Sequence, residues 1–138
     1  IELELTYKLS KTVNIDSNFS LLDSKDNNTG EPMPGSSDWI ANIGLNIQPN
    51  SNTNLSIQFH AISEFYREAA DTRSMLDGYN TTDFTLSIKD MFERDLSFRF
   101  GIKNLFNKDV RYPAPELTYI DDHPRAGSQW WMQLSYEF

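Results

Sequence analysis

The chain of 138 residues carries 20 acidic and 12 basic side chains, which gives a formal net charge of −8 at pH 7. The absence of cysteine excludes disulfides, thiolate zinc sites and cysteine nucleophiles. The negative charge argues against nucleic acid as a partner, because phosphate binding needs clustered Lys and Arg. The longest apolar runs have three residues, whereas a transmembrane helix needs about 20.

Apolar and polar residues alternate in seven segments. In the last one, Trp130, Met132 and Leu134 alternate with Gln129, Gln133 and other polar residues. Side chains on a strand point alternately to opposite faces, so each segment is predicted to be a β-strand with one apolar and one polar face. No segment shows a convincing helical repeat. In chain order the predicted strands cover residues 1–9, 13–21, 39–48, 55–61, 83–89, 96–103 and 129–138.

The connections between these segments alternate in length. Short connections at 10–12, 49–53 and 90–95 alternate with long ones at 25–37, 68–78 and 107–128. Consecutive strands joined by short turns are antiparallel. The sequence therefore predicts an all-β, antiparallel up-and-down meander of about seven strands, with the short turns at one end and the long loops at the other.

Two kinds of all-β fold fit this pattern. A secreted β-sandwich that binds carbohydrate would bury Leu5, Ile43, Phe100 and Leu134 in one dry core. A transmembrane barrel explains the alternation of short turns and long loops and the ten-residue final strand. Barrels also carry aromatic girdles, and we expect these residues near the ends of the sheet: Phe19, Trp39, Phe65, Tyr66, Phe84 and Trp130 by the long loops, and Tyr7, Tyr136 and Phe138 by the short turns.

The number of strands limits the barrel interpretation. An open seven-stranded sheet would leave unpaired backbone groups in hydrocarbon at several kcal/mol each, and bacterial single-chain barrels have even strand numbers. Residues 1–138 are therefore expected to be a segment of a larger barrel, which would also account for a chain that begins with Ile1. The alternative is a small autonomous outer-membrane barrel that closes between its first and last strands.

Three stretches suggest a family. Residues 101–112, which include Asn104, Leu105 and Phe106, resemble the Asn-Leu-Phe-Asp/Asn-Lys-x-Tyr signature near the end of TonB-dependent receptors. Residues 127–138 resemble the final strand of these 22-stranded outer-membrane transporters, and residues 30–35, followed by a strand that begins with Trp, are similar to an earlier loop. The resemblance covers essentially the whole chain. One position departs from the pattern, because Ser128 follows Gly127 where the family usually has Arg.

The resemblance implies part of an active-transport receptor of the bacterial outer membrane, and not an enzyme. Such a receptor imports a scarce nutrient, such as a ferric siderophore, and is energised through TonB. The implied partners are outer-membrane lipid, the plug domain and remaining barrel strands of the full-length protein, the TonB complex and the barrel-assembly machinery. The plug domain and the N-terminal strands are expected to lie outside residues 1–138, and no cofactor is expected.

The resemblance assigns a role to the C-terminal strand. Leu134, Tyr136 and Phe138 are expected to form the signal that the barrel-assembly machinery recognises, although a plain apolar strand face would have the same residues. Asn104, Leu105 and Phe106 are expected to be structural, because Asn can satisfy backbone groups where a strand ends.

The long loops contain the candidate ligand contacts. Arginine and tyrosine could hold an anionic ferric chelate through charge and stacking; the candidates are Arg73, Tyr79, Arg111, Tyr112, Tyr119 and Arg125, with Arg67 nearby. The alternative is that these are ordinary solvated loop residues. Asp121, Asp122 and His123 form the one cluster with metal-ligand chemistry, and we expect a solvated charge run there. The sequence predicts no catalytic or metal site.

Overall fold

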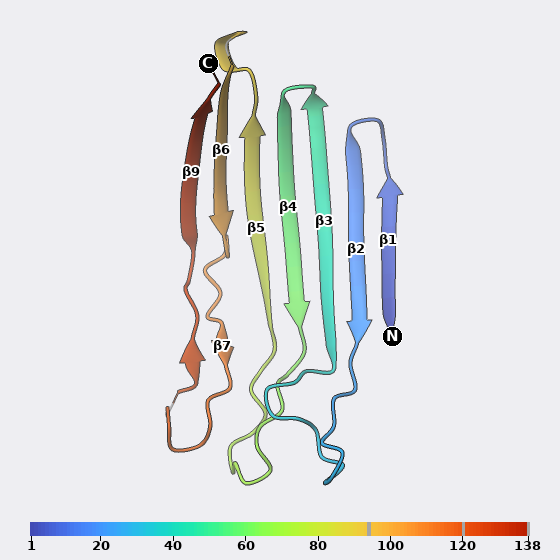
Figure 1. Cartoon of the computed structure of the whole chain (residues 1–138), viewed down its shortest axis with the longest axis vertical. Helices are drawn as coiled ribbons and strands as arrows, with labels where there is room; N and C mark the ends of the chain where they lie inside the picture. Colours follow the sequence, from blue (N-terminus) through green and yellow to red (C-terminus); the bar gives the residue numbers. More distant parts are fainter. Residues whose placement is uncertain (94, 120, 138) are drawn as a thin grey trace.

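The computed structural model describes residues 1–93, 95–119 and 121–137. Seven strands form one antiparallel sheet in the order β1-β2-β3-β4-β5-β6-β9 (Figure 1). Their bounds are β1 Glu2–Lys8, β2 Val13–Leu21, β3 Trp39–Asn50, β4 Thr53–Ile62, β5 Tyr79–Ile88, β6 Leu96–Lys103 and β9 Gln129–Tyr136. Within the described residues, no helix is long and apolar enough to cross a membrane.

The predicted meander is confirmed. The short turns lie at one end of the sheet and the long loops, 22–38, 63–78 and 104–128, lie at the other (Figure 1). The turn predicted at 49–53 is shorter than expected, because β3 continues through Pro49 to Asn50. A register shift between Ile47 and Asn50 accommodates the proline, which cannot donate a ladder hydrogen bond.

Two small elements lie outside the predicted strands. A single 3-10 turn, η1 (Met91–Glu93), lies between β5 and β6. Inside the last long loop, β7 (Arg111–Tyr112) pairs with β8 (His123–Pro124) as a separate two-stranded ribbon. Segments of two or three residues are too short to produce a hydrophobic period, so the alternation of the sequence does not reveal them.

The register separates the charged side chains from a mainly apolar face across the whole sheet. Leu45 pairs with Ile57, and Ile57 pairs with Phe84, so one face is apolar from strand to strand. Asn42 pairs with His60 on the opposite face, because directly paired residues project to the same side. Every Asp, Glu, Lys, Arg and His of the seven strands lies on this polar face, namely Glu2, Glu4, Lys8, Asp16, His60, Asp83, Arg99 and Lys103.

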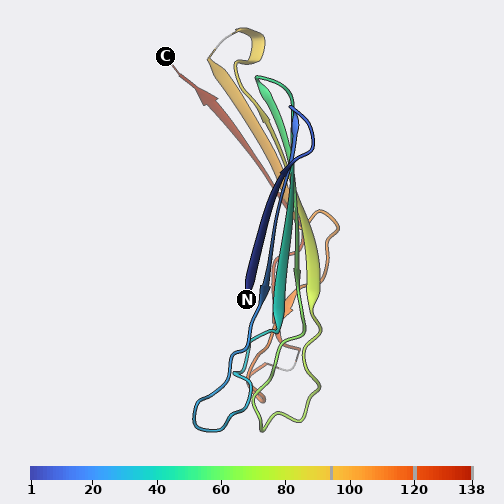
Figure 2. The same ribbon diagram turned by 90° about the vertical axis from the view of Figure 1, so that its right-hand side faces the viewer.

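No second layer covers the apolar face in the described part of the chain. The sheet is a single twisted layer when viewed from its side (Figure 2). Leu5, Ile43 and Leu134 are 60%, 48% and 67% exposed, so the described residues form no dry β-sandwich core and that alternative is wrong. Among the described residues, the buried apolar residues are Phe65, Ile102, Val110 and Ala114. Three of these four lie in the long loops and not beneath the sheet.

The sheet is open. β1 and β9 occupy opposite edges, and the described residues contain no pairing between them. The small closed barrel therefore does not form from these strands. An open edge is incompatible with hydrocarbon, so further strands are needed on both sides if this sheet crosses a membrane.

The structure corrects part of the predicted aromatic girdles. Phe19 stacks on Trp39 with ring centroids 6.2 Å apart at the long-loop end of the apolar face, and Trp130 is 70% exposed on that face. Phe84 instead lies in mid-strand, because β5 begins four residues before its predicted start. Phe65 is 3% exposed and packs inside the loops.

The separation of the two faces predicts that two neighbouring lysine substitutions in β4 differ in their effect on stability. Ile57→Lys places a charge on the apolar face, and such a charge costs about 2–4 kcal/mol at the centre of a bilayer. Gln58→Lys, one residue along, places the same charge on the polar face. We expect Ile57→Lys to lower the free energy of unfolding in lipid vesicles by that amount and Gln58→Lys to leave it within about 1 kcal/mol, as measured by urea titration of the full-length protein. Equal losses would contradict the assignment of the faces.

Candidate functional site in the long loops

Backbone contacts join the first two long loops. Phe65 pairs with both Ser37 and Leu76 in isolated bridges, and the Gly35 amide donates to the Tyr66 carbonyl at 2.8 Å. The Tyr66 hydroxyl donates to Asp38 Oδ1 at 3.0 Å, and this hydrogen bond to a carboxylate raises the pKa of Tyr66. Loops 22–38 and 63–78 therefore form one packed unit.

Four charged residues join loop 63–78 to loop 104–128, and we call them the ionic clasp: Arg67, Asp71, Arg73 and Asp122. Arg67 donates from Nη1 and Nη2 to the two carboxylate oxygens of Asp122 at 2.8 and 2.7 Å. Arg73 binds Asp71 in the same bidentate manner, with its Nη2 at 2.6 Å and its Nε at 2.9 Å. Arg73 also donates to the Ala114 carbonyl at 2.7 Å, and the Ala114 amide donates to Asp122 Oδ1 at 3.0 Å.

Three of the four clasp side chains are shielded from water, whereas that of Arg73 is 27% exposed. The side chains of Arg67 and Asp122 are each 8% exposed and that of Asp71 is 2% exposed. Hydrogen bonds from Arg73 lower the pKa of Asp71 from 3.8 to about 2, and those from Arg67 hold the pKa of Asp122 well below its usual range. The same pairs raise the pKa values of both arginines. All four groups therefore stay charged at neutral pH and hold one another in place.

The clasp corrects one expectation for the acidic cluster at 121–123. Asp122 is 6% exposed and belongs to the clasp, so a solvated charge run is wrong for this residue. Asp121 and His123 are exposed. Within the residues that the structure describes, no group of three or more His, Cys, Asp or Glu side chains is placed to hold a metal ion.

Three rings pack together where the loops meet the polar face. Phe65 lies 6.2 Å from Tyr79 and 5.7 Å from Tyr112, measured between ring centroids. The hydroxyls of Tyr79 and Tyr112 are hydrogen-bonded at 3.1 Å. The exposed guanidinium of Arg125 lies 5.0 Å from the centre of the Tyr112 ring, within the range of a cation–π contact.

The remaining candidate ligand contacts lie apart from these rings. Arg111 donates to Asp109 Oδ2 at 3.0 Å and to the Asp121 carbonyl at 2.6 Å. Tyr119 is 48% exposed, and its ring lies 5.5 Å from that of His123. The structure thus places Tyr79, Tyr112 and Arg125 together, whereas the guanidinium of Arg73 is engaged in the clasp.

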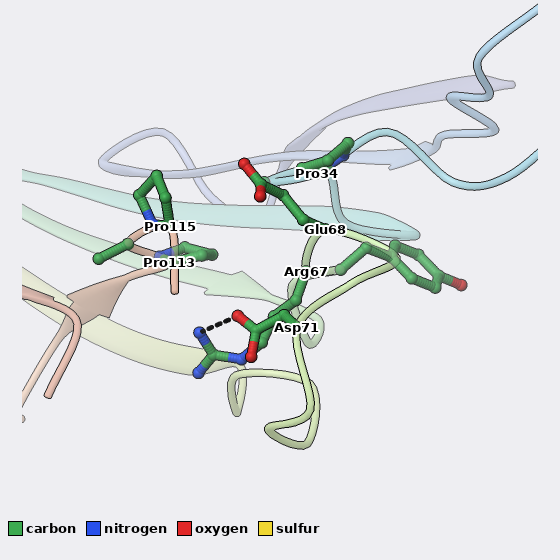
Figure 3. Close-up of a pocket in the computed structure, with 9 residues that line it drawn as sticks. Pro34, Arg67, Glu68, Asp71, Pro113 and Pro115 are labelled. Carbon is green, nitrogen blue, oxygen red and sulfur yellow. Dashed lines mark ion pairs between the residues drawn. The ribbon is translucent and has the colours of Figure 1, made fainter. Parts of the chain in front are cut away.

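The pocket in Figure 3 lies above the clasp and has a volume of about 200 Å³. Residues of all three long loops line it, among them Pro34, Glu68, Pro113 and Pro115. Its charged floor consists of Arg67 and Asp71, whose nearest charged atoms are 3.8 Å apart. Because both groups are already paired within the clasp, the pocket offers a ligand its ring and proline surfaces and the carboxylate of Glu68.

Asn104 closes the turn that follows β6. It has a positive φ of 50°, a conformation that Asn tolerates better than most residues. Its side chain donates to the Lys108 carbonyl and accepts from the Lys108 amide, both at 2.8 Å, while its carbonyl accepts from Ser128 Oγ at 2.6 Å. Leu105 and Phe106 are 38% and 76% exposed.

The C-terminal candidates lie at the open edge of the sheet. Leu134 and Tyr136 are 67% and 60% exposed on the apolar face of β9. Phe138 lies outside the described residues.

Sequence reasoning missed the clasp as a unit. Arg67 and Asp122 are 55 residues apart along the chain, and Arg73 and Asp122 are 49 residues apart. The local signals are the spacing of Asp71 and Arg73, which are two residues apart, and that of Arg67 and Asp71, which are four residues apart. Pairing across such separations depends on how the loops fold back over the sheet, and no local pattern encodes that path.

Comparison with known families gives one match. Residues 1–105 match the sequence model of the family described as "TonB dependent receptor-like, beta-barrel". No curated protein matches the chain in sequence.

Solved structures share the fold. A variant of the ferric enterobactin receptor of Pseudomonas aeruginosa is 18% identical with a TM-score of 0.78, and the match covers 96% of this chain and 21% of that one. The siderophore receptor PirA of Acinetobacter baumannii is 19% identical with a TM-score of 0.76, and the match covers 99% of this chain and 21% of that one. The copper transporter OprC is 16% identical with a TM-score of 0.79, and the match covers 96% of this chain and 22% of that one. The chain thus spans about a fifth of the length of these structures, and at such identities the likeness establishes the fold.

The burial of the clasp predicts a large effect for the loss of one arginine. Arg67→Met keeps the length of the side chain but leaves the buried Asp122 carboxylate short of its main partner, at a cost of about 2–3 kcal/mol. Arg111→Met is the matched control, because its pair with Asp109 is 37% and 68% exposed and such pairs contribute up to about 1 kcal/mol. Hydrogen exchange of the Phe65 and Leu76 amides measures both effects. Unchanged protection in Arg67→Met would show that the clasp does not order the loops.

The lowered pKa values predict how the loops respond to acid. A carboxyl group with a folded-state pKa below its unfolded value stabilises the fold fully above the unfolded pKa. For Asp71 this contribution is present above pH 3.8 and is lost as the pH falls through about 2. We therefore expect loop 63–78 to resist protease at pH 4.5 and to become sensitive between about pH 4 and 2. Sensitivity that begins near pH 6 would point to other groups.

Proposed function

Because the chain belongs to the TonB dependent receptor-like β-barrel family, we propose that residues 1–138 form the C-terminal part of a barrel that imports a scarce nutrient, such as a ferric siderophore, with energy supplied through TonB. Barrels of this family reside in the bacterial outer membrane, and the family and its structural neighbours are transport receptors, not enzymes. The plug domain and the N-terminal strands would belong to the rest of the full-length protein.

One observation carries the proposal, which is the confinement of every strand charge to a single face of an open sheet. The uncharged face suits lipid, and the charged face suits an aqueous lumen. The open edges would pair with strands of the same barrel. In this arrangement the short turns face the periplasm and the three long loops face the exterior.

The external loops would capture the nutrient. Arg125 and Tyr112 combine an exposed positive charge with a ring, and such a pair fits an anionic, aromatic chelate. Tyr119 and Arg111 would offer further contacts elsewhere in the same loop. Arg73 would act indirectly, because its guanidinium holds the loops together, and Tyr79 would support the Tyr112 ring. A ferric siderophore is proposed because the structural neighbours include a ferric enterobactin receptor and a siderophore receptor, whereas the copper transporter among them keeps other metals open to test.

The other partners follow from the family. A plug domain would fill the lumen and connect it to TonB in the periplasm. The barrel-assembly machinery would recognise the apolar face of the last strand, through Leu134, Tyr136 and Phe138. The substrate would pass along the polar face after the plug rearranges.

Uptake of a labelled ferric siderophore by cells that express the full-length receptor tests the proposal. We expect uptake to require both the receptor and TonB, and binding at the cell surface to require the receptor alone. Arg125→Ala should weaken binding about tenfold, since it removes one charge-assisted contact. Lys25→Ala is the matched control, because Lys25 is a 56% exposed loop cation that pairs locally with Asp23. Uptake that persists without TonB, or equal binding by Arg125→Ala and the original receptor, would contradict the corresponding part of the proposal.

A further inference from the structure

The pocket above the ionic clasp has a size, a set of rings and a charge that together define what it can hold. Its volume of about 200 Å³ is smaller than the roughly 300–1,000 Å³ of a site that encloses a whole small-molecule ligand. It is therefore suited to one arm of a larger molecule. Residues of all three long loops line it, so its shape depends on the clasp that joins two of these loops.

The charged groups in the floor of the pocket already have their partners. Arg67 donates from both Nη atoms to Asp122 and from Nε to the Ser74 carbonyl at 2.6 Å. Asp71 accepts from the guanidinium of Arg73 at 2.6 and 2.9 Å and from the Arg73 amide at 3.0 Å. A ligand that enters the pocket therefore finds neither a free cation nor a free anion in the floor.

Glu68 is the remaining charged residue of the lining. It is exposed, and its carboxylate has no partner within the described residues. Figure 3 shows this carboxylate directed away from the Arg67–Asp71 pair. An adjoining hollow of about 290 Å³ shares Glu68 with the pocket and adds Glu31, another exposed carboxylate. Among the described residues, the unpaired charge at this recess is therefore negative.

Rings from each of the three loops form the sides of the pocket. Pro34 comes from loop 22–38, Tyr66 from loop 63–78, and Pro113 and Pro115 from loop 104–128. The Tyr66 hydroxyl is bound to Asp38, which holds the ring in place. Rings of this kind bury the carbon surface of a ligand without asking for a hydrogen bond, so the sides of the pocket suit an apolar or aromatic stem.

We propose that this pocket binds a protonated amine on a short apolar or aromatic stem, with the ammonium group at the Glu68 carboxylate and the stem between the rings of the lining. An anionic group is disfavoured, because Glu68 repels it and the cations of the described lining are already paired. The inference rests on the proposed function, since it takes the long loops to be the surface that captures the nutrient. It deepens that function by giving the nutrient a cationic arm, while the anionic chelate is left to Arg125, which does not line the pocket.

Three probes that share one ring on a short stem test this preference on the full-length receptor in detergent micelles. Near neutral pH, phenethylamine is a cation, 2-phenylethanol is neutral and 3-phenylpropanoate is an anion. Titrations followed by NMR of the probes give the affinity of each.

Three variants are compared with the original receptor. Glu68→Gln removes the charge of the pocket. Glu64→Gln is the matched control, because Glu64 is an exposed carboxylate of the same loop that lines neither the pocket nor the adjoining hollow. Pro34→Trp fills the pocket with a larger ring. Heat-modifiable gel mobility confirms that each barrel is folded.

We expect the original receptor to bind phenethylamine about fivefold more tightly than 2-phenylethanol, as one ion pair at a surface allows, and to bind 3-phenylpropanoate least tightly. Glu68→Gln should bring the ratio of amine to alcohol close to one and leave the affinity for the alcohol unchanged, because the rings remain. Glu64→Gln should keep the ratio, and Pro34→Trp should abolish the binding of both probes. Raising the salt concentration from 0.15 to 1 M shortens the screening length from about 8 to 3 Å, so the ratio should fall.

Equal affinity of the original receptor for the amine and the alcohol would overturn the amine pocket, as would a ratio that Glu68→Gln leaves unchanged or that Glu64→Gln lowers equally. Binding of the amine that survives Pro34→Trp would place it elsewhere and overturn the pocket too. A receptor that shows the expected preference, yet imports no nutrient through TonB, would contradict the proposed function alone. TonB-dependent uptake by a receptor without the preference would contradict the amine pocket alone.

Discussion

The cost of placing a charge in hydrocarbon organises this chain. Lys or Arg on the lipid side of a barrel costs about 2–4 kcal/mol at the centre of a bilayer, and all the charged strand residues project to the opposite face. Strands with a period of two meet this constraint only if their register is held, because a slip of one residue would exchange the two faces. One requirement, that charged side chains stay out of hydrocarbon, therefore accounts for the strand register, the short turns and the uncharged face.

Few side chains are buried against the sheet, whereas the long loops contain a small buried core of their own. Phe65, Val110 and Ala114 are buried in the loops, where the clasp of Arg67, Asp71, Arg73 and Asp122 replaces the hydrophobic packing that a soluble domain would use. Because the cost of desolvating two charges offsets much of their attraction, we infer that the clasp serves mainly to fix one arrangement of the loops. A fixed arrangement would suit the nutrient capture that we propose for these loops.

The sequence predicted the structure wherever apolar and polar residues alternate with the period of a β-strand. The seven strands, the alternation of short turns and long loops and the separation of faces followed from residues such as Ile57 and Gln58, whose side chains must point in opposite directions. The Asn104-Leu105-Phe106 stretch and the final strand pointed to the family. Three features could not be predicted: the limits of β5, the ribbon β7–β8 and the burial of Asp122. They depend on contacts between segments that are far apart in the chain. The same holds for Phe65, whose position beside Tyr79 and Tyr112 depends on how the loop folds back.

The most direct test of this account is a scan of single cysteines along β4, from Leu55 to Ala61, in the full-length receptor within lipid vesicles; the present sequence has no cysteine that would interfere. Each cysteine would carry a fluorophore, and quenching by a lipid-soluble and by a water-soluble quencher would be compared. The account predicts strict alternation, with lipid contact at 55, 57, 59 and 61 and water contact at 56, 58 and 60. Equal access of the water-soluble quencher to both sets would contradict it.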